Sequence, residues 1–390
     1  ETTTGPLGQG VAVSVGMAIA GRWLAATYNR PSYNLFEHNV YALCGDGDMM
    51  EGISSEAASL AGHLKLANLC WIYDDNNISI EGSTDITFTE DVAARFAAYG
   101  WHVVRVSDAN DLALLTHAYE TFLAINDRPT LIIVRSHIGY GAPHKQDRRE
   151  AHGEALGSEE VRLAKEFFGW NPDSKFYVPE GVVTHLKAQL GNRGATERAN
   201  WKQLFAAYRT QYPDLAKQID CMQLRGLPEN WDSALPTFPA DPKGSATRES
   251  SGKVLNAIAG KMPWLLGGAA DLAPSTKTEL KDAFCGSFQA PSQGNNEGGN
   301  YSGRNFHFGV REHAMCAIAN GLSLSKLRPY AASFFIFTDY CRASIRLSAM
   351  MEIPVIYIWT HDSISLGEDG PTHQPIEHLA SLRAMPGMIV

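Results

Sequence analysis

The sequence predicts an α/β protein with two domains, each built on a mainly parallel β-sheet that is flanked by helices. Short apolar segments with the composition of buried strands recur along the chain, and helical segments separate them. This alternation occurs twice, on either side of a polar stretch that contains several prolines. Short apolar strands that alternate with helices are typical of parallel sheets covered on both faces. A chain of 390 residues is long enough for two such domains.

The first predicted domain comprises residues 1–170. Apolar strand patterns alternate there with helical patterns, the first of which is rich in Ala, Val and Met. The predicted strands cover residues 40–44, 69–73, 102–106 and 130–135, and the predicted helices cover residues 10–28, 51–64 and 111–125.

Residues 171–245 show few strand patterns and contain polar helical segments such as residues 197–209. We predict that they form a mostly helical connection between the domains. The alternation resumes in residues 246–390, the second predicted domain. Its strands are expected over residues 264–268, 330–333 and 355–359, its helices over residues 249–261, 311–326 and 339–351, and a Gly/Asn-rich loop over residues 292–300.

The composition argues against several classes of partner. The net charge is −9 and no long run of Lys or Arg is present, which argues against a nucleic-acid or anionic-membrane surface. We expect no apolar stretch of the roughly 20 residues that a membrane span needs. The six cysteines form no CxxC pair, so we expect buried reduced thiols and a cytoplasmic protein.

Both ends of the chain are expected to be truncations. The chain begins at Glu1, directly in a motif, and ends at Val390 in a pattern that resembles the start of a strand. The absence of a targeting segment therefore excludes no compartment.

Polar residues follow two neighbouring predicted strands. Gly45-Asp46-Gly47 follows the first, Asn76 follows the second, and 28 residues lie between Gly47 and Asn76. Ligands of open parallel sheets bind at the carboxyl ends of the strands, so the two polar side chains are expected side by side. Carboxylate, amide and carbonyl oxygens suit Mg²⁺ or Ca²⁺. Gly-Asp-Gly alone predicts only a turn, and the paired Asn makes the metal site the better interpretation.

Gly-Asp-Gly followed by Asn at this spacing resembles the diphosphate and metal motif of thiamine-diphosphate enzymes. Four further segments resemble the transketolase family in the same order: Thr-Thr-Thr-Gly-Pro-Leu-Gly-Gln-Gly at 2–10, Asp-Leu-Ala-Pro-Ser at 271–275, Val-Arg-Glu-His at 310–313, and His-Asp-Ser-Ile-Ser-Leu-Gly-Glu-Asp-Gly-Pro-Thr-His at 361–373. The similarity covers the whole chain, which is identified as a member of this family without its N-terminal segment and C-terminal domain. The first domain would then bind the diphosphate and the second the aminopyrimidine.

The resemblance implies thiamine diphosphate and Mg²⁺ as cofactors, with Ca²⁺ or Mn²⁺ as alternatives. The implied metal ligands are Asp46, Asn76 and the carbonyl of Ile78. The residues implied to contact the organic cofactor are Gly5, Pro6, Leu7, Gly47, Asn76, His152, Asp271, Glu312, Phe334, Phe337 and Tyr340. Phe337 would stack on the pyrimidine ring, and aromatic core packing is compatible with that role.

Two residues are implied to be catalytic. Glu312 would donate a hydrogen bond to the pyrimidine nitrogen and so favour the imino form, which takes the proton from the thiazolium carbon. His152 would act as general acid and base at the substrate oxygen. His152 is also an implied substrate residue. The terminal phosphate of the sugar would be bound by Arg248, Ser275 and His361. The sugar hydroxyls would be bound by Asp369 and His373.

The implied reaction is the reversible transfer of a two-carbon ketol unit from a ketose phosphate, xylulose 5-phosphate, to an aldose phosphate such as ribose 5-phosphate or erythrose 4-phosphate. The implied assembly is a homodimer with active sites at the subunit interface. Dihydroxyacetone synthase and a non-catalytic relative remain as alternatives. Deoxyxylulose-phosphate synthase fits less well, because a pyruvate-using site does not need Asp369 and His373.

The chain departs from the family pattern at two places. Asp48 stands where Cys, Ser or Glu is more common, and it adds a charge beside the expected metal. His152 follows Arg149-Glu150-Ala151 and lacks the Asp-Ser that often precedes this histidine. His137 and His144 flank the loop at residues 139–143, and the sequence leaves their roles open.

Overall fold

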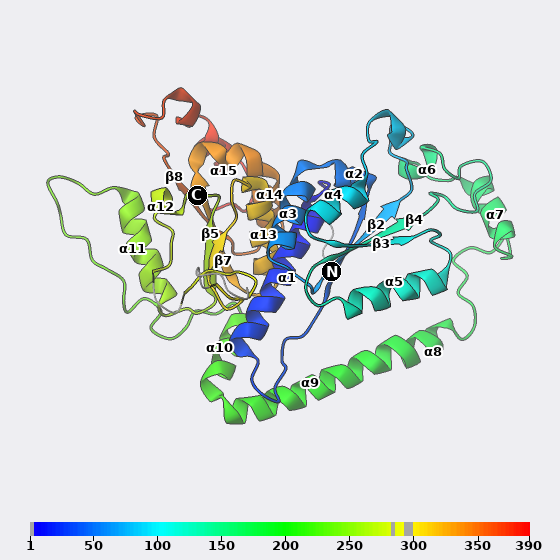
Figure 1. The fold of residues 1–390 in the computed structure, drawn as a ribbon, viewed down its shortest axis with the longest axis horizontal. Coiled ribbons are helices and arrows are strands. Elements are labelled where there is room, and N and C mark those ends of the chain that lie inside the picture. The colour runs from blue at the N-terminus through cyan, green and yellow to red at the C-terminus, as the bar shows by residue number, and fades with distance from the viewer. Residues whose placement is uncertain (1–3, 282–284, 292–298) are drawn as a thin grey trace.

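The computed structural model describes residues 4–281, 285–291 and 299–390, and within them two parallel four-stranded sheets (Figure 1). The first sheet has the order β1-β2-β4-β3, with β1 (Val40–Gly45), β2 (Leu69–Asp75), β3 (His102–Val106) and β4 (Thr130–Arg135). The second has the order β6-β5-β7-β8, with β5 (Leu265–Ala269), β6 (Asn305–His307), β7 (Arg328–Phe334) and β8 (Ile356–Thr360). The predicted fold class is confirmed. Thr2, Thr3 and most of the Gly/Asn-rich segment at residues 292–300 lie outside the described residues.

Helices flank both sheets (Figure 1). Those of the first domain are α1 (Gln9–Tyr28), α2 (Asp46–Met50), α3 (Gly52–His63), α4 (Val92–Ala98), α5 (Leu112–Ala124), and the 3₁₀ turn η1 (Thr84–Ile86). Those of the second are α11 (Thr247–Ala259), α12 (Ala273–Thr276), α13 (Glu312–Leu324), α14 (Thr338–Met350), α15 (His378–Arg383), and the 3₁₀ turns η3 (Phe335–Phe337) and η4 (Pro371–His373).

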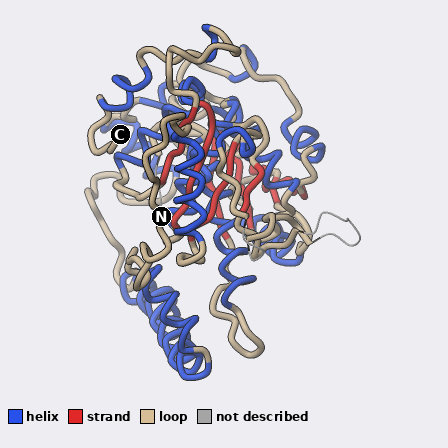
Figure 2. Tube along the Cα trace, turned by 90° about the vertical axis from the view of Figure 1, so that its left-hand side faces the viewer, coloured by secondary structure: helices blue, strands red, loops and turns tan. Residues whose placement is uncertain are grey.

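Further helices connect the two sheets: α6 (Glu150–Gly153), α7 (Ser158–Phe167), α8 (Val182–Leu186), the π-helical turn η2 (Lys187–Gly191), α9 (Asn192–Gln211) and α10 (Pro213–Gln223). Segments α8 to α9 form one long rod of helix (Figure 1), which stands away from the sheets in the perpendicular view (Figure 2). The hydroxyl of Tyr208 donates to the carbonyl oxygen of Tyr28 at 2.8 Å, which attaches the end of this rod to α1. The domain boundaries at residues 170 and 245 stay a prediction.

The register of the first sheet brings its polar strand ends together. Gly45 pairs with Asp74 across β1 and β2, and Asp75 pairs with Arg135 across β2 and β4. The residues that follow these strands therefore leave the sheet at one edge. Strands β2 and β4 are largely buried, as expected for the centre of a parallel sheet.

Helix α1 of the first domain packs along α13 of the second, and one apolar core runs through both domains. The two helix backbones nearly touch. A Cβ atom on Gly16 would lie 2.1 Å from the carbonyl oxygen of Ile318, and one on Gly321 would lie 2.1 Å from that of Val13. Only glycine permits such a close approach.

The expectation that no apolar stretch is long enough to span a membrane was wrong, because one helix is long enough. Helix α1 has 20 residues with a mean hydropathy of 1.3, and by length and composition alone it could cross a bilayer. However, 67% of that stretch is buried inside the protein, where α1 packs against α3 and α13. Burial by neighbouring helices is the environment of a core helix, and it explains the apolar composition.

Candidate functional site

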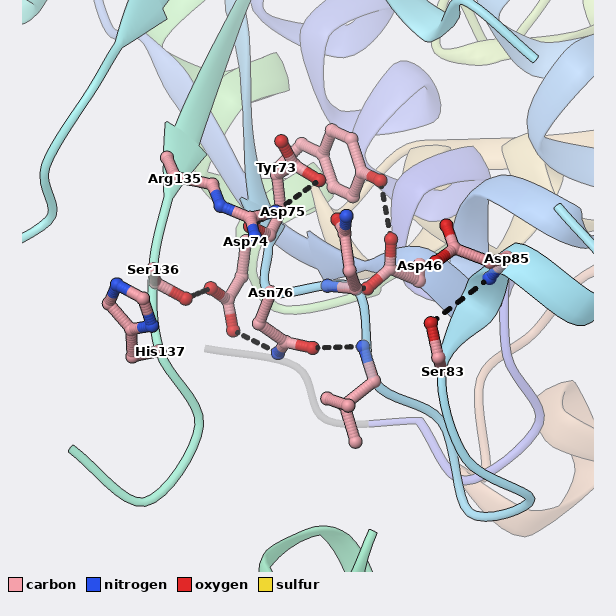
Figure 3. A network of polar contacts seen from close by, with 12 residues as sticks. Asp46, Tyr73, Asp74, Asp75, Asn76, Ser83, Asp85, Arg135, Ser136 and His137 are labelled. Carbon is pink, nitrogen blue, oxygen red and sulfur yellow. Dashed lines mark hydrogen bonds and ion pairs between the residues drawn. The ribbon is translucent and has the colours of Figure 1, made fainter. Parts of the chain in front are cut away.

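Asp46 lies at the carboxyl end of β1 with only 4% of its surface exposed (Figure 3). Its Oδ1 atom accepts a hydrogen bond from the Tyr73 hydroxyl at 2.6 Å, and its Oδ2 atom accepts one from the backbone N–H of Asn77 at 3.2 Å. Burial raises the pKa of Asp46 above its usual value, because desolvation outweighs these hydrogen bonds. Burial also raises the pKa of Tyr73, so its hydroxyl keeps the proton that it donates.

Asn76 follows β2 and is held in one orientation. Its Nδ2 atom donates to Oδ2 of Asp74 at 3.0 Å, and its Oδ1 atom accepts from the backbone N–H of Ile78 at 2.9 Å (Figure 3). Asp74 in turn accepts a hydrogen bond from the hydroxyl of Ser136 after β4. The amide oxygen of Asn76 therefore faces the turn that carries the Ile78 carbonyl, while the contact of Asn77 with Asp46 places both strand ends side by side.

The donor chemistry at this edge fits a divalent cation. Asp46, Asn76 and the backbone of Ile78 supply a carboxylate, an amide oxygen and a carbonyl oxygen, which are the hard ligands that Mg²⁺ and Ca²⁺ prefer. A buried carboxylate with a raised pKa gains a compensating positive charge when a cation binds. No cluster of three or more His, Cys, Asp or Glu ligands occurs among the described residues, which is compatible with a set that contains one carboxylate.

The N-terminal loop lies against the Gly-Asp-Gly turn. A Cβ atom on Gly47 would come within 2.8 Å of Cδ1 of Leu7, so glycine lets the loop with Gly5 and Pro6 approach. Asp48 fixes this arrangement, since its carboxylate accepts from the backbone N–H groups of Gly8 at 2.7 Å and Gly45 at 2.9 Å. The unusual Asp48 therefore links loop and turn.

His152 lies exposed in the short helix α6. Its neighbour Gly153 approaches Ile80, because a Cβ atom on Gly153 would lie 3.7 Å from Cδ1 of Ile80. The loop that carries His152 therefore borders the Asn76–Ile80 segment. The two histidines whose roles the sequence left open hold this loop in shape: Nδ1 of His137 lies 2.9 Å from Oδ2 of Asp147, and Nδ1 of His144 lies 3.0 Å from Oε2 of Glu160.

A second group of candidate residues surrounds the carboxyl end of β7. The rings of Phe334 and Phe337 stack with centroids 6.0 Å apart and an angle of 14° between their planes. The His373 ring meets Phe337 edge-on, with centroids 5.5 Å apart. The centroid of the Tyr340 ring lies 6.0 Å from that of Phe337. The His361 ring lies 3.7 Å from Phe334. The structure thus brings together an aromatic group defined by Phe334, Phe337, Tyr340, His361 and His373.

Arg248 and His361 meet at the rim of this group. Nη1 of Arg248 lies 3.4 Å from Nε2 of His361, and both residues line a cavity of about 390 Å³ beside β8. Burial lowers the pKa of His361, and the Arg248 charge lowers it further. A cation beside an imidazole at a cavity wall is suited to an anionic group.

Three other predicted substrate or cofactor residues are exposed, two of them on loops and Ser275 within α12. Asp271 and Ser275 follow β5, and Asp369 precedes η4. Helix α12, which carries Ser275, contacts β8, the strand that directly precedes His361, and the place of Ser275 in the phosphate clamp stays a prediction. Asp369 is near enough to His361 to oppose the lowering of its pKa.

Glu312 opens α13 beside the aromatic group and is 7% exposed. Its Oε1 atom accepts from the hydroxyl of Ser333 at 3.4 Å, and Ser333 directly precedes Phe334. Burial raises the pKa of Glu312, which favours the protonated carboxyl group. Arg311 is turned away from it and donates to Ser59 of the first domain at 3.1 Å.

Three residues without glycine's freedom adopt left-handed backbone conformations within two positions of the end of a strand. They are Asn77 after β2 with φ of 61°, Asp271 after β5 with φ of 62°, and His361 after β8 with φ of 57°. Such conformations cost free energy and are enriched at functional sites. Each of the three lies at a candidate strand end, and no local sequence pattern predicted them.

Sequence analysis did not identify Tyr73, Ser333 and Glu56. Tyr73 and Ser333 contact Asp46 and Glu312, and both lie at or near the ends of strands that had been predicted. Glu56 accepts from the backbone N–H of Ala314 at 2.9 Å and so connects α3 to the start of α13. The position of Tyr73 and Ser333 at strand ends could have identified them. Glu56 contacts a residue 258 positions away, so no local sequence pattern could have identified it.

Two family descriptions divide the chain. Residues 1–228 match "Transketolase, thiamine diphosphate binding domain", and residues 243–390 match "Transketolase, pyrimidine binding domain". The transketolases of Halalkalibacterium halodurans and Geobacillus stearothermophilus are each 51% identical to the chain over 391 residues, and transketolase 1 of Saccharomyces cerevisiae is 47% identical over 393 residues. These alignments cover 100% of this chain and 57% of each relative, so the chain spans little more than half the length of those relatives.

Solved structures agree with this assignment. A mutant transketolase of Pichia stipitis in complex with xylulose 5-phosphate is 44% identical and has a TM-score of 0.93, covering 98% of this chain and 56% of that one. A transketolase of Leishmania mexicana is 41% identical with a TM-score of 0.92, covering 99% and 56%. On the combined match of both halves, the chain belongs to the transketolase family and carries its thiamine-diphosphate-binding and pyrimidine-binding domains.

Proposed function

We propose that the protein containing this chain is a transketolase that binds thiamine diphosphate with Mg²⁺ and transfers a two-carbon ketol unit between sugar phosphates. The observation that carries the proposal is the pairing of two complementary sites. Asp46 and Asn76 form a hard-ligand edge on one sheet, and Glu312 stands beside a stacked aromatic pair on the other. Solved relatives from Pichia stipitis contain xylulose 5-phosphate and sedoheptulose 7-phosphate.

Asp46, Asn76 and the Ile78 carbonyl would hold the metal, while Gly47 and the Gly5–Leu7 loop would leave room for the diphosphate. Bound thiamine diphosphate supplies a carbon nucleophile and an electron sink for breaking and forming a carbon–carbon bond. Glu312 would share its proton with the pyrimidine ring, a role that a raised pKa favours. Phe337 and Phe334 would hold the ring and exclude water from the reacting carbon.

The substrate contacts follow from charge and position. Arg248 and His361 would bind the terminal phosphate at the mouth of the cavity beside β8. His373, in contact with Phe337, and the exposed Asp369 would contact the sugar hydroxyls. His152 would exchange a proton with the substrate oxygen, from the loop that borders Asn76–Ile80.

We further propose a homodimer in which one active site combines the first domain of one copy with the second domain of the other. The cavity beside Asp46 is lined by residues between positions 46 and 133, and the cavity beside Arg248 by residues between positions 246 and 366. Each is thus lined by one domain, which supports a site completed by a second copy of the chain. Sedimentation of the cofactor-loaded protein tests this, because a loaded monomer would contradict it.

The function is tested by cofactor binding and by turnover. Calorimetric titration of thiamine diphosphate is expected to show binding that requires Mg²⁺ and disappears with EDTA. With xylulose 5-phosphate as donor, ribose 5-phosphate is expected to be the better acceptor. Faster turnover with formaldehyde would identify a dihydroxyacetone synthase, and cofactor binding without turnover on either acceptor would indicate a non-catalytic relative.

A further inference from the structure

The first four residues at the start of α13 each make a different contact. Arg311 donates to Ser59, and the N–H of Ala314 donates to Glu56, both on α3 of the first domain. Glu312 instead accepts from Ser333 on β7 of its own domain. The first domain therefore holds this turn from one side, while Glu312 points to the other.

His313, which is half-buried, joins this turn to α1 through a polar network, defined here as Gln9, His313 and Ser344. Nε2 of Gln9 lies 2.6 Å from Nε2 of His313, and the Ser344 hydroxyl donates to Oε1 of Gln9 at 2.8 Å. Gln9 is 1% exposed and Ser344 is 0% exposed. Burial of these groups makes each hydrogen bond costly to lose.

The orientation of the Gln9 amide fixes the state of the His313 ring. The Ser344 hydroxyl lies 2.8 Å from Oε1 of Gln9 and 3.3 Å from the carbonyl oxygen of His313. With the amide oriented so that Oε1 accepts from Ser344, the amide nitrogen donates to Nε2 of His313. In that orientation the ring is neutral and carries its proton on Nδ1. Burial lowers the pKa of His313, which is compatible with a neutral ring.

The network joins three segments that the proposed function uses. Gln9 follows the Gly5–Leu7 loop, His313 follows Glu312, and Ser344 lies on α14, which begins directly after Phe337. Successive residues of a helix point about 100° apart, so fixing the direction of His313 also fixes the direction of Glu312. The near contact of α1 with α13 at Gly16 and Gly321 prevents the helix from moving to compensate.

We propose that Gln9 and His313 are positioning residues that orient the Glu312 carboxyl through their shared hydrogen bond. The proposal rests on the proposed function, in which Glu312 addresses the pyrimidine ring. It adds a role for two residues that touch neither the metal ligands nor the aromatic group.

The first test concerns the hydrogen bond itself and requires no turnover. The nitrogen-15 shifts of the His313 ring, identified by their loss in His313→Gln, are expected to show protonated Nδ1 and unprotonated Nε2 in the protein loaded with thiamine diphosphate and Mg²⁺. The Gln9→Ala variant is expected to change the Nε2 shift. A protonated Nε2 in the unmodified protein would overturn the proposal.

The second test separates positioning from stability. Replacing His313→Leu is expected to lower kcat about 100-fold, as for a misplaced catalytic group, while the dissociation constant of thiamine diphosphate stays unchanged. His313→Gln keeps an acceptor oxygen and is expected to restore most of kcat. Leu322→Ala, in the last turn of the same helix, is the control that lowers Tm and leaves kcat unchanged.

Two results would contradict the positioning role. One is an unchanged kcat in folded His313→Leu; the other is a loss of kcat in Leu322→Ala equal to that in His313→Leu at matched Tm. Failure of the proposed function is distinguishable from both, since the unmodified protein would then bind no thiamine diphosphate or catalyse no ketol transfer.

Discussion

The two sheets of this protein have equivalent strand ends that carry opposite chemistry. At the edge of β1 and β2, the candidate residues are carboxylates, amides and backbone groups such as those of Asp46 and Asn76. At the edge of β7 and β8, they are rings, namely the aromatic group around Phe334 and Phe337. One fold thus supplies a site for a charged, metal-bound end and a site for a flat ring.

The two edges differ in the structural elements that position their side chains. The polar edge is built on residues that directly follow two strands whose register is fixed at Gly45 and Asp74. The aromatic edge depends on the turn η3 and on the loops before η4, which gather residues that are far apart in sequence. Substitutions at the first edge should therefore affect binding of the metal and the diphosphate. Substitutions at the second edge should affect catalysis and the choice of substrate.

The largest expected effect comes from Glu312→Ala, which tests whether catalysis belongs to the second edge. Turnover is expected to fall about 1,000-fold, within the range for loss of an acid–base group. Binding of Mg²⁺ and the diphosphate is expected to persist, because Glu312 contacts Ser333 and not the first edge. Steady-state kinetics and calorimetry measure the two effects. Glu377→Ala, an exposed change in the same domain, is the control, and normal turnover in Glu312→Ala would remove the division of roles.

Asp46→Asn tests whether the first edge is a binding site. The amide keeps the shape of the side chain and loses its charge, so the Mg²⁺-dependent affinity for thiamine diphosphate is expected to fall about 100-fold. Calorimetric titration at fixed Mg²⁺ measures it. Asp85→Asn lines the same cavity and serves as the matched control. Equal losses of affinity in both variants would show that the total negative charge of the cavity matters, and that Asp46 is not a specific metal ligand.

A smaller effect is expected for Arg248→Leu at the rim of the aromatic edge. Loss of a charged hydrogen bond to the substrate phosphate should raise KM for phosphorylated sugars by about 10- to 100-fold, with kcat nearly unchanged. The control is Lys253→Leu on the same helix, whose amine lies over the ring of Phe238. If KM for an unphosphorylated sugar rises equally, Arg248 does not bind the phosphate.

The smallest expected effect is the pH dependence of stability from Glu312. Because burial raises its pKa above 4.5, its contribution is fully present below that value and is lost as the pH rises through the folded pKa. Glutamine does not ionise, so Glu312→Gln is expected to gain stability relative to the unmodified chain between pH 5 and pH 8. Urea unfolding without cofactor measures this difference, and a difference independent of pH would contradict a buried titrating carboxyl.

The sequence was sufficient for the strands and for the first edge. The strands at residues 102–106 and 130–135 were predicted with the bounds that the structure shows, because they are apolar runs with clear ends. Asp46 and Asn76 were found because each directly follows a strand and parallel strands end at one edge. The short strand β6 was missed, since Asn305–His307 has neither the length nor the apolar composition of a buried strand.

The second edge could be predicted only as a set of residues and not as an arrangement. Arg248 and His361 meet across 113 positions of sequence, and nothing local requires the left-handed backbone that His361 adopts. Contacts such as Glu56 with Ala314 arise from packing between domains, which local patterns do not encode.

The paired glycines at the crossing of α1 and α13 restrict how this protein can be recombined with its relatives. Gly16 of α1 makes room for the backbone of α13, and Gly321 of α13 makes room for the backbone of α1. A hybrid that exchanges the second domain alone would keep α1 from one parent and receive α13 from another. Breakpoints should therefore be judged by whether both helices come from the same parent, because a single methyl group inserted at either glycine would drive the two halves of the molecule apart.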